Sequence, residues 1–190
     1  MRRGAVRQNW RLLLFFLRVF VLCSCVAPQV LQAESLILSQ VRTELYFSPK
    51  GGAEAAIVRA IGQTKNEICV LAYSFTSVPI DEALAAAHQR KVKITVILDK
   101  SQTTARGGRL RSLQEAGVPV FIDSTHAIAH NKVMILDKSR VVTGSFNFTR
   151  SAEERNAENL LILANRALSK KYLEDFARHL EHAAPTEPDQ

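Results

Sequence analysis

The residues with the clearest chemical potential lie between His130 and Asn147. His130, Lys132 and Asp137 occur in the run H-N-K-V-M-I-L-D, and the run G-S-F-N, which ends at Asn147, begins after six more residues. A histidine can attack phosphorus as a nucleophile, and a lysine two positions later can hold a phosphate oxygen. The amide and hydroxyl of the second run can donate to the same oxygens. The pattern therefore predicts a site for phosphoryl chemistry.

Strand geometry explains the spacing of this motif. Residues two positions apart share a face of an extended strand, so we expect His130 and Lys132 to point to one side of a strand at 129–136. Asp137 is at an odd offset from Lys132 and should face away, where it makes structural contacts. Ser145 follows a glycine at a turn, and its hydroxyl suits either the site or a local capping bond.

Apolar runs alternate with helical patterns along the rest of the chain. We expect strands at 41–47, 67–75, 92–98, 118–122, 129–136, 141–144 and 159–163, and helices at 53–61, 79–87, 110–116 and 168–180. Several strands are apolar throughout, as is typical of strands buried on both faces. The predicted fold class is α/β, with one domain per chain and a mixed, largely parallel β-sheet flanked by helices on both faces.

The motif H-x-K-x4-D-x6-G-S-x-N resembles the HKD signature of the phospholipase D superfamily. Matching segments outside its first half are A-Y-S-F-T at 72–76, G-S-F-N-F-T at 144–149 and N-A-E-N at 156–159. As a whole, residues 41–180 resemble the small bacterial nucleases of that superfamily. The resemblance implies a phospholipase D-like fold, phosphodiester hydrolysis, and a catalytic set of His130, Lys132, Asn147 and Glu158, with Asp137 and Ser145 in support.

The chain has one such motif and no visible internal duplication. Because the superfamily builds its active site from two motifs, the resemblance implies a homodimer in which two His130 residues meet at a two-fold axis. One imidazole would form a phosphohistidine while the other protonates the leaving alcohol. Lys132 and Asn147 of both subunits would surround the phosphate. Glu158 is the best candidate for the acceptor that orients the nucleophilic imidazole.

Basic residues follow the strand at 92–98, in a loop where α/β sheets usually place ligands. We expect substrate phosphates to contact Lys100, Arg106, Arg109 and Arg111, although a charge run of this kind is equally typical of a solvated surface. Tyr73, Phe146 and Phe148 suit either the core or base stacking.

No metal site and no cofactor are predicted, because the carboxylates are scattered and the chain has neither a cysteine cluster nor H-E-x-x-H. His126 is interpreted as a loop residue. The histidines at 88, 179 and 182 are interpreted as solvated helix residues without partners.

Residues 1–33 differ in composition from the rest of the chain. Four arginines precede an apolar stretch at 12–27, and the segment L-Q-A at 31–33, which ends in the small residue Ala33, offers a cleavage site. This order is typical of a secretory signal peptide. We therefore expect a secreted, periplasmic protein with no stable membrane span after cleavage, a domain at 34–184 and a polar tail at 185–190. An uncleaved membrane anchor, or lipidation near Cys25, is the alternative.

Charge and cysteine content depend on this leader. The chain has 25 basic and 18 acidic side chains, but five arginines and no acids lie in 1–33, so residues 34–190 have 20 basic and 18 acidic side chains and a net charge of +2. A high isoelectric point therefore does not point to nucleic acid. Cys69 would be alone in the mature chain, buried in an apolar strand and unable to form an intramolecular disulfide.

Together these features predict a secreted, dimeric, metal-independent phosphodiesterase. The expected activity is endonucleolytic cleavage of DNA with little sequence preference, and RNA is left open as a second substrate. Two alternatives stay open. One is a phospholipid hydrolase of the phospholipase D type, and the other is a nucleic-acid-binding accessory protein with an inactive site.

Overall fold

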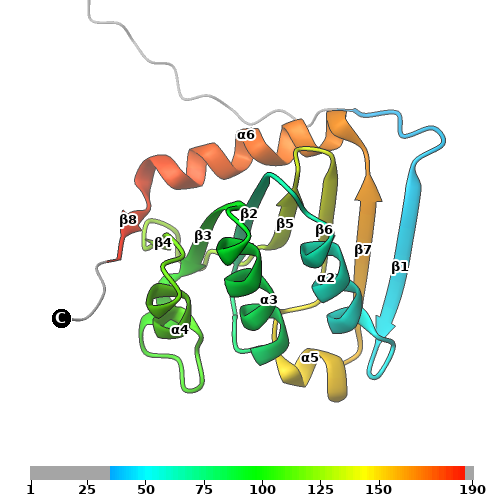
Figure 1. The fold of residues 1–190 in the computed structure, drawn as a ribbon. Helices are drawn as coiled ribbons and strands as arrows, with labels where there is room; N and C mark the ends of the chain where they lie inside the picture. Colours follow the sequence, from blue (N-terminus) through cyan, green and yellow to red (C-terminus); the bar gives the residue numbers. More distant parts are fainter. Residues whose placement is uncertain (1–34, 187–190) are drawn as a thin grey trace, which may run out of the picture. The chain divides into compact units, whose positions relative to one another are not determined.

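Eight strands form one sheet in the described part of the chain, in the order β1-β7-β6-β5-β2-β3-β4-β8 (Figure 1). The computed structural model describes residues 35–186, so the predicted signal peptide and the end of the predicted tail lie outside the described residues. The strands are β1 (Arg42–Ser48), β2 (Glu67–Ala72), β3 (Lys93–Asp99), β4 (Val120–Asp123), β5 (Lys132–Leu136), β6 (Arg140–Gly144), β7 (Glu158–Ala164) and β8 (Ala184–Pro185).

Helices connect most of these strands. They are α2 (Ala53–Gly62), α3 (Val78–Gln89), α4 (Leu110–Glu115), α5 (Arg150–Glu154), α6 (Arg166–His182) and the 3-10 helix η1 (Lys100–Thr103). Side-chain caps start the two longest, because Ser77 Oγ accepts the Ile80 amide at α3 and Asn165 Oδ1 accepts the Leu168 amide at α6. None of the helices between residues 35 and 186 is long and apolar enough to cross a membrane.

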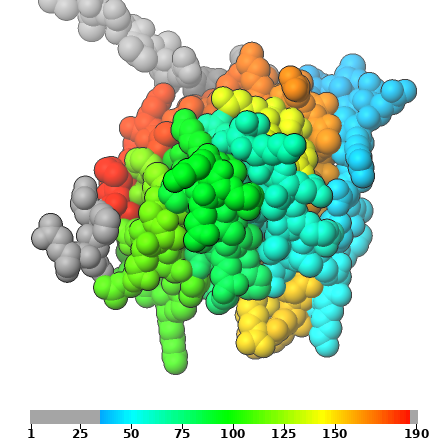
Figure 2. Space-filling view, in the orientation of Figure 1, coloured from blue at the N-terminus to red at the C-terminus, as the bar shows by residue number. Residues whose placement is uncertain are grey.

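Alternate residues of the central strands enter two different cores. Val70 and Met134 pack with residues of α2, α3 and α4, the helices that cover the sheet in Figure 2. Leu71 and Val133 point to the other face and pack with Phe176 of α6. The prediction of helices on both faces is therefore confirmed. Cys69 is buried in the second core, as predicted, and burial raises the pKa of its thiol to about 12.

The sheet is mixed, as predicted, but the prediction that it is largely parallel is wrong. Parallel pairing joins β2 to β3 and β3 to β4, whereas the other neighbouring strands are antiparallel. Apolar runs indicate burial on both faces, and here antiparallel strands are buried in the same way. A tight turn with positive φ at Asp137 (49°) and Lys138 (53°) joins β5 to β6, a connection that only antiparallel strands can use.

One end of these strands gathers polar residues from distant parts of the sequence. Ala72, at the end of β2, pairs with Lys132 at the start of β5. Asp99 and Asp123, at the ends of the parallel strands β3 and β4, pair with each other. The end of β6 and the start of β7 lie at the same end, because each of these strands runs antiparallel to its neighbour. The HKD-like residues and the loop after β3 therefore share one end of the sheet.

Candidate functional site

His130 lies in the loop that precedes β5 and is exposed to solvent. The predicted strand at 129–136 is therefore too long at its start, since β5 begins at Lys132. Backbone contacts hold this loop on both sides of the histidine. Asp99 Oδ2 accepts the Ala129 amide at 2.7 Å, and the Tyr73 amide donates to the Asn131 carbonyl at 2.8 Å. The imidazole is thus presented to solvent from a fixed backbone.

The ring of Tyr73 brings the histidine and the lysine together. The ring centroids of Tyr73 and His130 are 4.4 Å apart, and Lys132 Nζ lies 5.0 Å from the Tyr73 centroid. Lys132 Nζ also donates to the His130 carbonyl at 3.0 Å. A cation near an aromatic face is attracted by the ring quadrupole. Tyr73 therefore contacts both side chains, whereas Phe146 and Phe148 are buried core residues.

Lys132 is a buried cation, with 7 % of the residue exposed. Burial lowers the pKa of its ammonium group, and the nearby Glu158 carboxylate opposes that shift. Glu158 Oε1 accepts a hydrogen bond from Asn156 at 3.2 Å. Among the described residues of this chain, no hydrogen bond joins Glu158 to His130, so the structure does not show the orienting contact that was predicted. It places Glu158 as a counter-charge to the buried lysine instead.

The G-S-F-N turn contributes an amide with unused hydrogen-bonding capacity. Asn147 Oδ1 is buried and has no hydrogen-bond partner in the described part of the chain, an arrangement that costs free energy unless a hydrogen-bond donor completes it. Ser145 Oγ instead accepts the backbone and side-chain amides of Asn159 at 3.1 and 3.3 Å. Gly144 is required here, because a Cβ would collide with the Asn159 carbonyl.

Asp137 lies at the opposite end of β5 from Lys132. Its carboxylate accepts three backbone amides, from Lys65 (3.0 Å), Asn66 (2.7 Å) and Glu67 (3.1 Å). Burial alone would raise the pKa of this carboxyl, but the three backbone hydrogen bonds outweigh burial and lower it. These contacts join the β5–β6 turn to the start of β2 and are structural.

Asp137→Asn should therefore destabilise the fold and leave the turnover of folded enzyme unchanged. Charged acceptors form hydrogen bonds about twice as strong as neutral ones, so we expect a loss of roughly 1–2 kcal/mol in urea unfolding. The folded-state pKa is lowered, so this stability is present above the unfolded pKa of about 3.9 and is lost as pH falls through the folded pKa. The difference in the free energy of unfolding between wild type and Asp137→Asn should therefore shrink as the pH falls. Glu115→Gln, which changes an exposed carboxylate, is the control. An Asp137→Asn protein as stable as wild type at neutral pH would contradict the structural role of Asp137.

The basic loop is only partly available to a substrate. Arg109 donates from Nε and Nη2 to Asp81 Oδ2 at 2.9 and 2.6 Å, and Asp81 is 2 % exposed. Contrary to the prediction, Arg109 therefore neutralises a buried carboxylate. Arg111 pairs with Glu115 at 3.7 Å on the surface. Lys100 is exposed and donates to the His126 carbonyl at 2.9 Å, and Arg106 is exposed.

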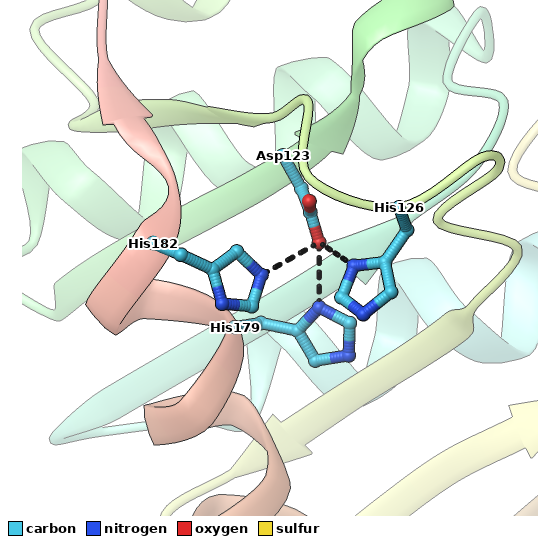
Figure 3. A group of neighbouring side chains, drawn as sticks. All are labelled: Asp123, His126, His179 and His182. Atoms are coloured by element: carbon cyan, nitrogen blue, oxygen red, sulfur yellow. Dashed lines mark hydrogen bonds and ion pairs between the residues drawn. The ribbon is translucent and has the colours of Figure 1, made fainter.

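Three histidines interpreted from sequence as a loop residue and solvated helix residues converge on one carboxylate (Figure 3). His126, His179 and His182 each place a ring nitrogen within 3.3 Å of Asp123 Oδ2. The interpretation that His179 and His182 lack partners is wrong. Their spacing along α6 and the D-x-x-H run at 123–126 were the available signals. Neither shows that the end of α6 lies beside the end of β4.

Comparison with known proteins identifies the family to which this chain is similar. Residues 57–180 match the family model described as "Cardiolipin synthase, PLD-like domain". A phospholipase D from Rickettsia prowazekii is 40% identical over 139 residues, which are 73% of this chain and 68% of the relative. A mitochondrial cardiolipin hydrolase from Xenopus laevis is 32% identical over 163 residues, or 86% of this chain and 68% of the relative.

Solved structures show the same fold. The phospholipase D family member Nuc from Salmonella typhimurium aligns with a TM-score of 0.75 and 33% identity, covering 78% of this chain and 99% of Nuc. NucT from Helicobacter pylori aligns with a TM-score of 0.72 and 21% identity over 77% of this chain and all of NucT, a likeness that concerns the fold. The predicted superfamily and its single-domain mixed fold are confirmed.

Proposed function

Since this chain belongs to the phospholipase D superfamily of phosphodiesterases, we propose that it cleaves DNA, with RNA as a second substrate, through a phosphohistidine intermediate. One observation carries the proposal: the exposed imidazole of His130 and the buried ammonium of Lys132 meet at the ring of Tyr73. Attack on a phosphodiester requires a nucleophile beside a fixed positive charge, so this arrangement supports the proposal.

The proposed reaction has two displacement steps. A ring nitrogen of His130 forms a bond to phosphorus as the bond to the leaving oxygen breaks, and a second imidazole gives that oxygen its proton. The second imidazole then takes a proton from water, and the resulting hydroxide releases the phosphate from His130. Lys132 Nζ and the side-chain N–H donors of Asn147 stabilise the charge on the phosphoryl oxygens in both steps. No step needs a metal ion.

The second imidazole is proposed to come from another copy of the chain. In an in-line displacement the leaving oxygen lies opposite the attacking nitrogen, so the nucleophile itself cannot reach it. His130 is exposed, and Ile128, two residues earlier, is 56 % exposed. An exposed apolar side chain beside an exposed catalytic group suits a two-fold contact that joins two sites.

Nucleic acid is favoured as substrate by the surroundings of His130. Lys100 contacts the loop that carries this histidine, and Arg106 is exposed in the segment after η1. Such cations bind a phosphate backbone without reading its sequence. The likeness of 41–180 to small bacterial nucleases supports the same substrate. The leader-like composition of residues 1–33 supports action outside the cytoplasm, in the periplasm.

A phospholipid is the second candidate substrate. The names of the relatives favour it, because they include phospholipases D from several Rickettsia species and mitochondrial cardiolipin hydrolases. A lipid headgroup carries the same phosphodiester, so the reacting residues would be unchanged. A nucleic acid and a phospholipid differ in the groups attached to the phosphate, and therefore in the protein surface that must surround it.

Purified protein should therefore nick supercoiled plasmid and leave labelled phosphatidylcholine and cardiolipin vesicles intact. His130→Ala protein at the same concentration is the matched control for contaminating nucleases. Cleavage should stay within a few fold when EDTA is added, because Lys132 and Asn147 supply the charge and donors that a metal would provide. If wild type but not His130→Ala releases lipid headgroups, and plasmid stays intact, the protein is a phospholipase and the proposed nuclease activity is wrong. Loss of cleavage in EDTA that magnesium restores would refute the metal-free reaction.

A further inference from the structure

Four side chains form a compact cluster that contains none of the residues assigned to catalysis. Asp123 ends β4 and is fully buried, and its Oδ2 lies 2.9 Å from His126 Nδ1, 2.7 Å from His179 Nδ1 and 3.3 Å from His182 Nε2 (Figure 3). The three imidazole centroids are 4.9, 5.1 and 5.6 Å apart. The cluster joins the β4–β5 loop to the last turn of α6.

Hydrogen bonds alone explain this convergence poorly. A carboxylate has about four acceptor positions spread over two oxygens, so one oxygen is suited to about two donors. Here three ring nitrogens approach Oδ2, while Oδ1 accepts the Thr125 amide at 3.1 Å. Three neutral imidazoles crowd a single oxygen, and three charged ones repel one another at these separations. A cation among the four groups removes both difficulties.

We propose that Asp123, His126, His179 and His182 bind a divalent transition-metal ion, with zinc as the expected occupant. One ligand atom from each residue can be chosen so that all four lie within 4.8 Å of one another. In a tetrahedral zinc site with bonds of about 2.0–2.1 Å, ligand atoms are about 3.3 Å apart, so small side-chain rotations complete the geometry. Imidazole nitrogens and a carboxylate suit zinc, and magnesium and calcium prefer all-oxygen sites.

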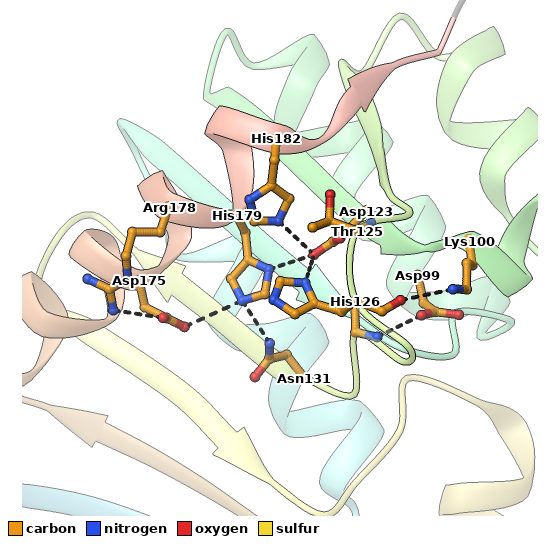
Figure 4. A network of polar contacts seen from close by, with 11 residues as sticks. Asp99, Lys100, Asp123, Thr125, His126, Asn131, Asp175, Arg178, His179 and His182 are labelled. Carbon is orange, nitrogen blue, oxygen red and sulfur yellow. Dashed lines mark hydrogen bonds and ion pairs between the residues drawn. The ribbon is translucent and has the colours of Figure 1, made fainter. Parts of the chain in front are cut away.

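Polar groups lie near the second ring nitrogen of one histidine of the cluster, His179. Ligating imidazoles commonly direct the second ring nitrogen to a carboxylate. His179 Nε2 lies 3.8 Å from Asp175 Oδ2 and 3.5 Å from the side-chain amide of Asn131, and Arg178 donates to Asp175 at 2.9 Å (Figure 4). His126 is held through its carbonyl, which accepts from Lys100.

The proposed site is structural, because four protein ligands leave a tetrahedral ion without an open position for substrate. Its ligands tie three segments together: the end of β4, the loop that leads to His130, and the end of α6. The metal would hold this loop in place without taking part in phosphoryl transfer. The proposal is independent of the proposed function, which uses His130, Lys132 and Asn147.

Metal content and thermal stability test the site. Protein purified through a histidine-free tag, stripped with chelator and dialysed with zinc should retain one zinc ion per chain by mass spectrometry. At free zinc about 100-fold above Kd, Tm should rise by roughly 5–10 °C over the stripped protein. Cobalt(II) should give the intense visible absorption of four-coordinate geometry. Wild-type protein that is folded, retains no zinc and shows no zinc-dependent change in Tm would overturn the proposal.

Variants locate the ion. His179→Asn and His126→Gln should each lose zinc retention and the zinc-dependent rise in Tm; His126 is on an exposed loop, so its variant serves if the helix variant fails to fold. His88→Gln on α3 is the matched histidine control and should behave as wild type. His130→Ala should keep its zinc and lose cleavage, which separates failure of this site from failure of the proposed function. Equal zinc retention in all four variants would place the ion elsewhere and refute the assignment.

Discussion

Replacing His130 with alanine should lower the rate of plasmid cleavage by more than about 10³-fold, the size of loss seen when a nucleophile or general acid is removed. In the proposed dimer the substitution removes both groups at once. The fold should survive, because the imidazole is exposed and its neighbours are held by backbone hydrogen bonds from Ala129 and to Asn131. Initial nicking rates at matched concentration, together with circular dichroism and Tm, measure the two effects.

His88→Gln is the control for this experiment, since it removes a histidine on α3, away from the loop before β5. It should retain cleavage within a few fold of wild type. A His130→Ala enzyme that also stays within a few fold would show that another group attacks phosphorus. A greatly lowered Tm of His130→Ala would instead show that the imidazole is needed for packing against Tyr73.

Mixing wild-type and His130→Ala chains should reduce activity more steeply than simple dilution. If subunits exchange freely and pair at random, the fraction of dimers with two intact imidazoles is the square of the wild-type fraction. At equal amounts of the two chains, activity per total chain should fall to about one quarter of the wild-type value, because a heterodimer cannot complete the cycle. Nicking rates across a series of ratios give the curve, and native mass spectrometry of differently tagged chains verifies exchange.

Two outcomes would defeat the shared site. A linear fall to one half at equal amounts, with exchange verified, would mean that each chain carries a complete site. Full activity in a verified monomer would mean the same. Either result would leave the second imidazole to be found within one chain, where His126, His179 and His182 are already engaged with Asp123.

Local sequence patterns were sufficient for the class of fold, whereas the catalytic roles of the motif residues stay predictions. Apolar runs and helical spacing predicted most elements within a few residues, because each pattern depends on how a short segment is buried. His130, Lys132 and Asn147 stand out because their types and spacing are unusual for a structural segment. The same patterns could not give strand direction: the residues at 132–136 and 141–142 are all buried, and such burial is the same in parallel and antiparallel strands.

Contacts between distant segments were decided only by the tertiary structure. Asp123 contacts His179 and His182, which lie 56 and 59 residues later in the sequence. Glu158, at the start of β7, opposes the lowering of the Lys132 pKa by burial. Arg109, predicted from its charge to bind phosphate, instead neutralises Asp81, a buried residue of α3 that also accepts a hydrogen bond from Ser112 of α4. A local pattern records the period and burial of its own segment, whereas these partnerships depend on strand order and on where α6 ends beside the sheet.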